Sequence, residues 1–251
     1  MEPPPPAGTA GSAPSDRRLC EVAENRPSGG YRIVSLRDRA GLEPLPGQFY
    51  VLAVATGQDE AGKPAFAPRP VPVAATMPGA GGVRLDFLVK GGDDDPLGDL
   101  APGDRVRVTG PLGTAFAAPR ELNPGAAGAV LVGEGLGIAP LALLRRRLGE
   151  RGVPLRVLLG FRGERGPGGL ELFCGSGAEL CPEVRIASED GRRGYRGVVT
   201  DLLAVLLEGD DAPSAVVYSC GPPAMLETVA QLCAERGVVC ESRPASPLVN
   251  P

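Results

Sequence analysis

The chain has 251 residues, enough for one large domain or for two ordinary domains that each bury a core. Its formal net charge of -4 excludes the basic field that binds nucleic acid or an anionic membrane. The chain has no histidine, which excludes imidazole as a general base or metal ligand. Glycine occurs 37 times and proline 28 times, and such frequent breaks favour short β-strands over long helices.

Cysteine use and the start of the chain set further limits. Six cysteines occur, and none forms the C-x-x-C pair typical of a zinc knot or a redox dithiol. Residues 1–15 lack the basic and apolar regions of a signal peptide, and their composition predicts a disordered arm. No apolar run reaches the roughly 18 residues that a membrane span needs. We therefore expect a cytoplasmic protein without a membrane or nucleic-acid partner.

The first half of the chain has the pattern of short strands. Strands are expected at residues 31–36, 48–54, 83–89 and 104–109. Breaks rich in glycine or proline separate them, and no convincing helix lies between them. This pattern is typical of a small antiparallel β-barrel, which we predict over residues 16–119.

The second half alternates strands with helices. Strands are expected at residues 129–132, 155–160, 183–187 and 215–219. Helices are expected at residues 141–148, 198–207 and 223–236, with Arg145, Arg146 and Arg147 of the first helix facing solvent. This alternation predicts an α/β domain with a doubly wound parallel sheet over residues 125–240, followed by a tail at 241–251.

A glycine-rich loop joins the first of these strands to the first helix. Residues 132–140 read Val-Gly-Glu-Gly-Leu-Gly-Ile-Ala-Pro. Such a loop lets free N–H groups and the positive end of a helix meet a diphosphate. It departs from the usual G-x-G-x-x-G because Ile138 occupies the third glycine position. The alternative interpretation is a glycine turn needed only for packing. The carboxylate of Glu134 fits neither interpretation well.

A second loop, at residues 219–225, follows the last predicted strand. Ligands of open α/β sheets collect at the carboxyl ends of the strands, so both loops should share one crevice. Cys220 would point into that crevice, although a lone cysteine is more often a small packing residue.

In the first half, Arg69 stands between Pro68 and Pro70 in a stiff, extended segment before a strand. Its guanidinium could clamp a pyrophosphate, although an ordinary exposed arginine is the more common case. The consecutive Asp93, Asp94 and Asp95 are interpreted as solvated loop residues, and no metal site is assigned.

Taken together, these motifs resemble the ferredoxin–NADP reductase superfamily, and within it the electron-transfer subunits of NAD-dependent dihydroorotate dehydrogenase. The resemblance runs from about Arg18 to Cys240. It rests on six segments in family order, at residues 46–50, 68–71, 102–113, 133–140, 197–202 and 220–225.

The resemblance implies two cofactors and a partner. In similar proteins the barrel binds FAD and the α/β domain binds NAD, so that hydride passes between nicotinamide and flavin. A [2Fe–2S] cluster then relays single electrons to a catalytic subunit, which holds FMN and interconverts dihydroorotate and orotate in pyrimidine biosynthesis. The chain would thus be an electron-transfer flavoprotein in a hetero-oligomer.

The resemblance also implies site residues. Contacts to FAD would come from Arg69, Pro70 and Val71 and from the backbone of Phe87 and Leu88. Cys220 would lie near the nicotinamide as the catalytic residue. The other residues expected at NAD lie in the two loops: Gly133, Gly135, Gly137, Pro140, Gly221, Pro222 and Met225.

The chain departs from the family pattern in three places. Pro72 replaces a serine that can hydrogen-bond the flavin, and Pro72 has neither a hydroxyl nor an N–H. Asp93 and Asp94 fall where the family has glycine and threonine beside the pyrophosphate, which a carboxylate repels. The cysteine cluster that would ligate [2Fe–2S] has no counterpart in residues 241–251.

Two alternative functions remain open, and so does the choice between NAD and NADP. The chain could be a non-catalytic relic that serves as a binding or regulatory subunit, or a stand-alone NAD(P)H reductase of a diffusible acceptor. Arg162 and Arg165 could receive a 2′-phosphate, but Glu164 stands beside them and the resemblance favours NAD.

Overall fold

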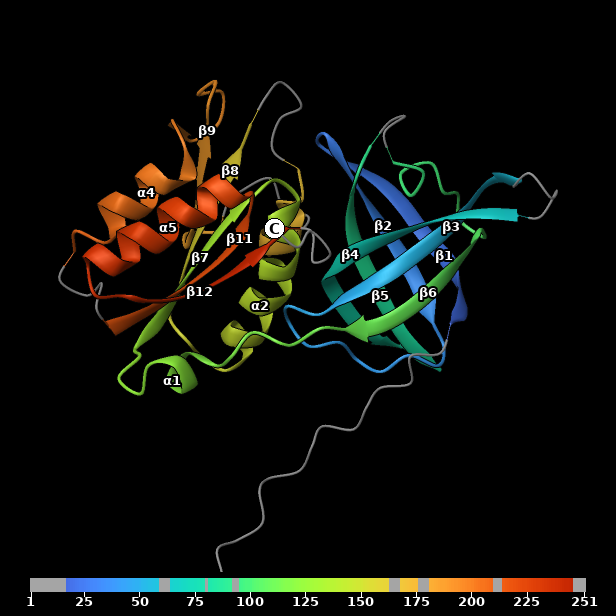
Figure 1. Ribbon diagram of the computed structural model, residues 1–251, viewed down its shortest axis with the longest axis horizontal. Helices are drawn as coiled ribbons and strands as arrows, with labels where there is room; N and C mark the ends of the chain where they lie inside the picture. Colours follow the sequence, from blue (N-terminus) through green and yellow to red (C-terminus); the bar gives the residue numbers. More distant parts are fainter. Residues whose placement is uncertain are drawn as a thin grey trace, which may run out of the picture.

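The structure is a computed structural model that describes residues 17–58, 64–79, 81–91, 95–162, 168–175, 181–209 and 214–245. Two domains lie side by side, an N-terminal barrel and a C-terminal layered sheet, with helix α2 between them (Figure 1). Within the described ranges, no helix has the length and apolar character needed to cross a bilayer.

The N-terminal domain is a closed antiparallel barrel, as the sequence predicts. Its strands follow the order β1-β2-β5-β4-β3-β6 around the barrel. Their bounds are β1 Arg18–Ser28, β2 Tyr31–Asp38, β3 Phe49–Gln58, β4 Pro64–Gly79, β5 Gly82–Lys90 and β6 Arg105–Leu112. Inward-facing apolar residues fill the barrel, and the rings of Tyr50 and Phe87 meet edge to face with centroids 5.8 Å apart. The barrel therefore has a core of its own.

Strand β4 changes partners along its length, and this explains its prolines. Residues 64–72 pair with β3, whereas residues 73–79 pair with β5. Val73 donates its N–H to the carbonyl of Gln48, next to β3. Backbone groups alternate in direction along a strand, so the carbonyls of Pro68, Pro70 and Pro72 point away from β3. Proline has no N–H to donate, and it is tolerated on such an unpaired edge. Sequence reasoning placed Arg69 before a strand, but Arg69 lies inside β4.

The C-terminal domain is a parallel sheet with the order β10-β9-β8-β7-β11-β12, in which β7 and β11 are central neighbours. Its strands are β7 Gly128–Glu134, β8 Leu155–Phe161, β9 Val184–Ser188, β10 Tyr195–Arg196, β11 Ala215–Gly221 and β12 Val239–Pro244. Its helices are α1 Pro119–Leu122, the 3-10 turn η1 Gly135–Gly137, α2 Ile138–Glu150, α3 Glu171–Cys174, α4 Val199–Leu206 and α5 Pro223–Glu235. Helices α4 and α5 cover the face away from the barrel (Figure 1).

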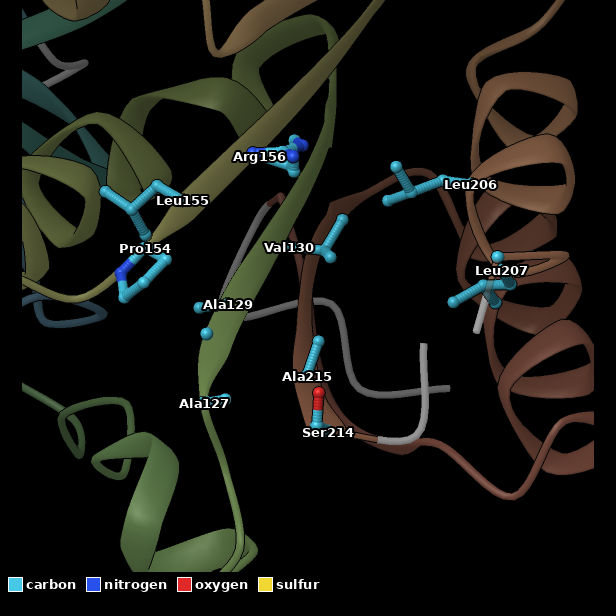
Figure 2. Close-up of a pocket in the computed structure, with 12 residues that line it drawn as sticks. Ala127, Ala129, Val130, Pro154, Leu155, Arg156, Leu206, Leu207, Ser214 and Ala215 are labelled. Carbon is cyan, nitrogen blue, oxygen red and sulfur yellow. The ribbon is translucent and has the colours of Figure 1, made fainter. Parts of the chain in front are cut away.

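A pocket of about 460 Å³ lies at the amino ends of β7, β8 and β11 (Figure 2). Its lining includes Ala127, Pro154 and Leu207, and it contains none of the residues expected to bind a cofactor. It therefore lies at the opposite end of the sheet from the two loops identified in the sequence.

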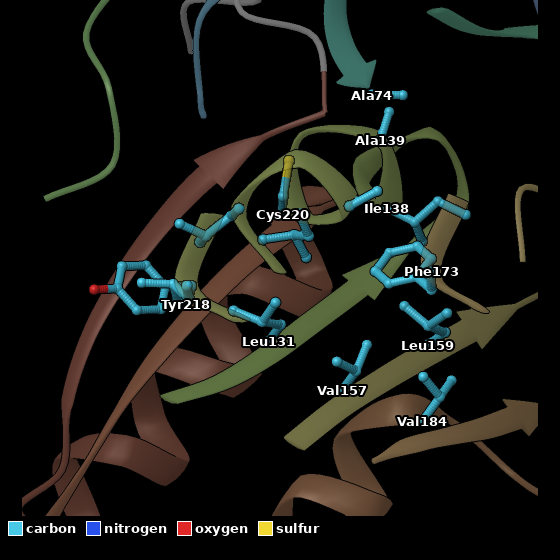
Figure 3. Packing of buried hydrophobic residues seen from close by; sticks show 14 of the residues in the cluster. Ala74, Leu131, Ile138, Ala139, Val157, Leu159, Phe173, Val184, Tyr218 and Cys220 are labelled. Atoms are coloured by element: carbon cyan, nitrogen blue, oxygen red, sulfur yellow. The ribbon is translucent and has the colours of Figure 1, made fainter. Parts of the chain in front are cut away.

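One continuous apolar core joins the two domains. Ile33, Ala74 and Leu88 of the barrel pack in the same cluster as Ile138 and Ala139 of α2. Figure 3 shows Ala74 beside Ala139, at the edge of the cluster, which contains residues of α2 and of the parallel sheet. The contact is apolar and buried, so it fixes the position of α2 against the barrel.

Polar contacts at the rim correct one sequence expectation. Arg146 donates to the carbonyl of Thr76 in β4, and Arg147 pairs with Glu43, a barrel-domain residue before β3. The expectation that Arg145, Arg146 and Arg147 face solvent was wrong, because α2 lies between the domains and its polar side meets the barrel. Arg145 instead pairs with Glu183 near the start of β9.

The closest approach of the two loops gives a stability prediction. A Cβ on Gly137 would lie 2.2 Å from the carbonyl oxygen of Cys220, so Gly137→Ala should lower the free energy of unfolding by about 2–3 kcal/mol through overpacking. Gly149→Ala, near the end of α2, is the control. Its Cβ would meet only Leu155, at 4.0 Å, and it should stabilise by up to about 1 kcal/mol. Urea unfolding of both variants measures this, and equal stabilities would contradict it.

Candidate functional site

The two loops predicted from the sequence touch one another. Strands β7 and β11 are parallel neighbours, and Gly133 pairs in register with Cys220. Gly137 then passes so close to the backbone of Cys220 and Gly221 that no side chain fits between them. The structure thus confirms that both loops meet at one carboxyl edge of the sheet.

The three glycines of the first loop have different physical roles. Gly135 has φ of +59°, a conformation that favours glycine, and a Cβ there would meet nothing closer than the Tyr31 hydroxyl at 3.7 Å. Gly133 and Gly137 are needed for close packing, since a Cβ on Gly133 would lie 3.0 Å from Leu141 and 3.1 Å from Ile138. The packing interpretation therefore explains two of the glycines, whereas the positive φ of Gly135 explains the third.

A pocket of about 240 Å³ lies where the barrel meets the sheet. Both domains contribute to it, and it brings together three residues that sequence reasoning singled out from distant segments, Pro72, Pro140 and Cys220. The other residues lining it are Gly47, Phe49, Gly113, Thr114, Arg243 and Pro244. An aromatic ring, prolines and one arginine give it flat apolar walls with a single cation.

The residues expected at FAD fall on two strands that separate. Arg69, Pro70 and Val71 lie in the part of β4 that pairs with β3, and β5 pairs with β4 only up to Phe87 among the described residues. Leu88 follows just beyond that point. Arg69 is exposed, whereas Val71, Phe87 and Leu88 are buried, so these last three can offer only backbone groups.

The residues of the second loop divide between two faces of the sheet. Met225 is buried with α4 and α5, and its sulfur would lie 2.9 Å from a Cβ on Gly221. Pro222 is half-buried and caps the start of α5. Met225 thus supports the loop from beneath, whereas Cys220 lines the pocket between the domains.

Cys220 is a neutral thiol in this site. The residue is only 1% exposed, and its sulfur lies 3.7 Å from the carbonyl oxygen of Pro244. Burial raises the pKa of this thiol to about 12, against the opposing effect of the Arg243 guanidinium. The raised pKa favours the neutral thiol near neutral pH, and a neutral thiol packs and makes weak hydrogen bonds.

Arg243 and Glu241 are site residues that sequence reasoning missed. Arg243 donates to the carbonyls of Thr114 and Ala115, both at 2.7 Å, and its guanidinium lies 4.5 Å from the centre of the Phe116 ring. Glu241 accepts from the Ala117 N–H at 3.0 Å. Both belong to β12, although the sequence pattern places residues 241–244 in a tail. The mixed polarity of β12 gives no strand signal, and only its pairing with β11 reveals it.

Glu134 is paired with Arg162, which follows β8. Their atoms Oε1 and Nε are 2.5 Å apart, and the Arg162 Nε also lies 3.6 Å from Glu189. Burial raises the pKa of the Glu134 carboxyl above its ordinary value, and Arg162 opposes this shift. The pair therefore sets the charge at the edge of the first loop.

Several sequence expectations lie outside the described residues: Asp93, Asp94, Glu164, Arg165 and the arm at 1–15. Within the part of the chain that the structure describes, no three His, Cys, Asp or Glu side chains gather into a group able to hold a metal.

Solved structures with a similar fold include ferredoxin reductases. The ferredoxin reductase in carbazole 1,9a-dioxygenase has a TM-score of 0.72 at 22% identity, over 92% of this chain and 69% of that one. A ferredoxin NADP+ reductase from Neisseria gonorrhoeae, with bound FAD and NADP, has a TM-score of 0.67 at 16% identity, over 91% of this chain and 98% of that one. At these identities the likeness shows the fold, which is of the ferredoxin reductase type.

Sequence relatives are more specific. No family model matches the chain. The dihydroorotate dehydrogenase B (NAD(+)) electron transfer subunit of Bacillus caldolyticus is 34% identical over 194 residues, 77% of this chain and 69% of that protein. The subunit of Desulforamulus reducens is 34% identical over 224 residues, 89% of this chain and 79% of that protein. The chain therefore belongs to the family of electron transfer subunits of dihydroorotate dehydrogenase B.

Proposed function

We propose that this chain binds FAD on its barrel and NAD at the loops of its parallel sheet, and transfers electrons between them. The electrons are passed between NAD(H) and a partner, the catalytic subunit of a dihydroorotate dehydrogenase. The observation that carries the proposal is the pocket between the domains, where Pro72 of the barrel and Cys220 of the sheet line one space. In a member of this family, that is where two redox rings would meet.

The residues present fit a flavin. The edge of β4 at Pro68, Pro70 and Pro72 is unpaired and bears backbone carbonyls but no N–H groups, so it can accept hydrogen bonds from a ring N–H. Arg69 is exposed on the same segment, so its guanidinium is accessible to a phosphate group of the cofactor. We assign the flavin contacts to Arg69, Pro70, Val71 and the backbone of Phe87 and Leu88.

The residues present also fit a dinucleotide. The first loop leads directly into η1 and α2, and Gly135 has no side chain to separate its backbone from a ligand. Free N–H groups at such a helix start attract a diphosphate. We assign this role to Gly133, Gly135 and Gly137, with Pro140, Gly221, Pro222 and Met225 shaping the crevice around them.

When bound, the two cofactors supply hydride transfer and single-electron transfer. The chain supplies position. Cys220 and Pro140 line the pocket from the sheet side. The hydrogen bonds of Arg243 to Thr114 and Ala115 hold β12 against the segment after β6. The family resemblance implies an iron–sulfur cluster, and among the described residues no group of cysteines gathers to ligate one.

The direct test is reconstitution of the full chain with FAD, followed by NADH oxidation with ferricyanide as acceptor. We expect flavin absorbance at a fixed stoichiometry and sustained turnover. Purification with the catalytic subunit of a dihydroorotate dehydrogenase should yield a complex. A colourless protein without turnover would instead support the non-catalytic subunit, an alternative that Pro72 in the pocket wall favours. Turnover without complex formation would support a stand-alone reductase.

Pro72→Ser should tighten FAD binding. The substitution restores a hydroxyl and an N–H at the pocket wall, and one added hydrogen bond of about 1 kcal/mol corresponds to roughly fivefold in the dissociation constant. Pro78→Ser, at an exposed position of the same strand, is the control and should leave affinity unchanged. Flavin fluorescence titration measures both. No gain at position 72 would remove Pro72 from the flavin site.

Cys220 should react slowly with iodoacetamide. With its pKa raised to about 12, its thiolate fraction at pH 8 is roughly a thousandfold below that of a thiol of pKa near 9. Labelling should rise with pH up to the limit of protein stability. The half-buried Cys174 is the internal control and should label first. Peptide mass mapping gives the order, and early labelling of Cys220 would contradict a neutral packing role.

A further inference from the structure

Glu134 is an unexpected residue for a loop that receives a diphosphate. Its side chain is only 6% exposed. A Cβ on Gly160 of β8 would lie 3.4 Å from its Cγ, and a Cβ on Gly221 of β11 would lie 3.4 Å from its Cβ. The Glu134 side chain therefore lies across the carboxyl ends of three adjacent strands, at the edge where the two loops meet.

Arg162 meets this carboxylate from the next strand. It directly follows β8, and its Nε lies 2.5 Å from Oε1 of Glu134, with Nη2 3.5 Å from Oε2. The Arg162 side chain is 54% exposed. One edge of the guanidinium is thus held by a buried carboxylate, and the rest of the group is open to solvent at the same edge of the sheet.

The charges of Glu134 and Arg162 determine whether a diphosphate can bind at this loop. An unpaired carboxylate at Glu134 would repel a diphosphate bound on the adjacent N–H groups of the loop. Arg162 offsets the charge of Glu134, and Glu189 lies 3.6 Å from the same Nε. A guanidinium has five N–H donors, and these carboxylates contact only its Nε and Nη2. The remaining donors match the geometry of phosphate oxygens.

We infer that Arg162 is the cationic contact for the diphosphate of the bound dinucleotide, and that Glu134 is the positioning residue that holds it at the loop. This inference rests on the proposed function. It explains why a carboxylate is tolerated between Gly133 and Gly135. It also assigns Arg162 to the diphosphate shared by NAD and NADP, because Glu134, which holds Arg162, stands between Gly133 and Gly135 of the first loop.

The test compares two ligands that differ in the diphosphate. ADP-ribose contains it, and adenosine contains no phosphate. Arg162→Ala in the full, FAD-loaded chain should weaken ADP-ribose binding by about tenfold or more and change adenosine binding by less than about twofold, measured by calorimetry. Arg156→Ala removes an exposed arginine from the start of β8 and should change neither. Equal losses for both ligands, or none, would overturn the inference.

A double-mutant cycle separates contact from mere charge compensation. In Arg162→Ala, Glu134 is an uncompensated anion, so adding Glu134→Gln should recover part of the ADP-ribose affinity. The double variant should remain several-fold weaker than the unmodified protein, because the diphosphate contact is gone. Full recovery would show that Arg162 only neutralises Glu134, and would overturn the inference.

Two further measurements keep the outcome unambiguous. Arg162→Lys retains the charge without the planar donors and should give an intermediate loss, so it serves if the alanine variant fails to fold. Thermal unfolding identifies such a failure. If the unmodified protein binds no ADP-ribose, the proposed NAD site itself fails. If it binds but Arg162→Ala binds equally well, only the role of Arg162 fails.

Discussion

Helix α2 packs against both domains at once, and the rest of the structure depends on this contact. Its first residues, Ile138 and Ala139, share a buried core with Leu88 and Ala74 of the barrel. The same turn follows the glycine loop, so the packing that fixes the domains also fixes the loop against the barrel. A shift of this helix would alter the pocket lined by Pro72, Pro140 and Cys220.

The sequence could predict the features that follow from local pattern. Alternation of strands and helices predicted the parallel sheet, and the neighbourhood of the two loops followed from the common carboxyl edge. The barrel followed from short strands separated by breaks. These predictions held because each depends on the periodicity or turn chemistry of one segment.

Features that depend on tertiary partners could not be predicted. Arg146 and Arg147 have the spacing of a solvent-facing helix side, and only the position of the barrel gives them partners. Glu134 is awkward in isolation because its partner Arg162 lies on the next strand. Strand β12 has no apolar alternation, yet its pairing with β11 brings Arg243 to the pocket. In each case the determining contact is between distant segments.

The prolines of β4 have a consequence for the behaviour of the barrel in a crowded solution. Where β4 and β5 separate, residues 64–72 of β4 have no β5 partner, and unpaired strand edges can recruit strands of other molecules into mixed sheets. An edge whose outward residues are Pro68, Pro70 and Pro72 can accept hydrogen bonds but cannot complete a ladder. This edge therefore disfavours the addition of a strand from another molecule.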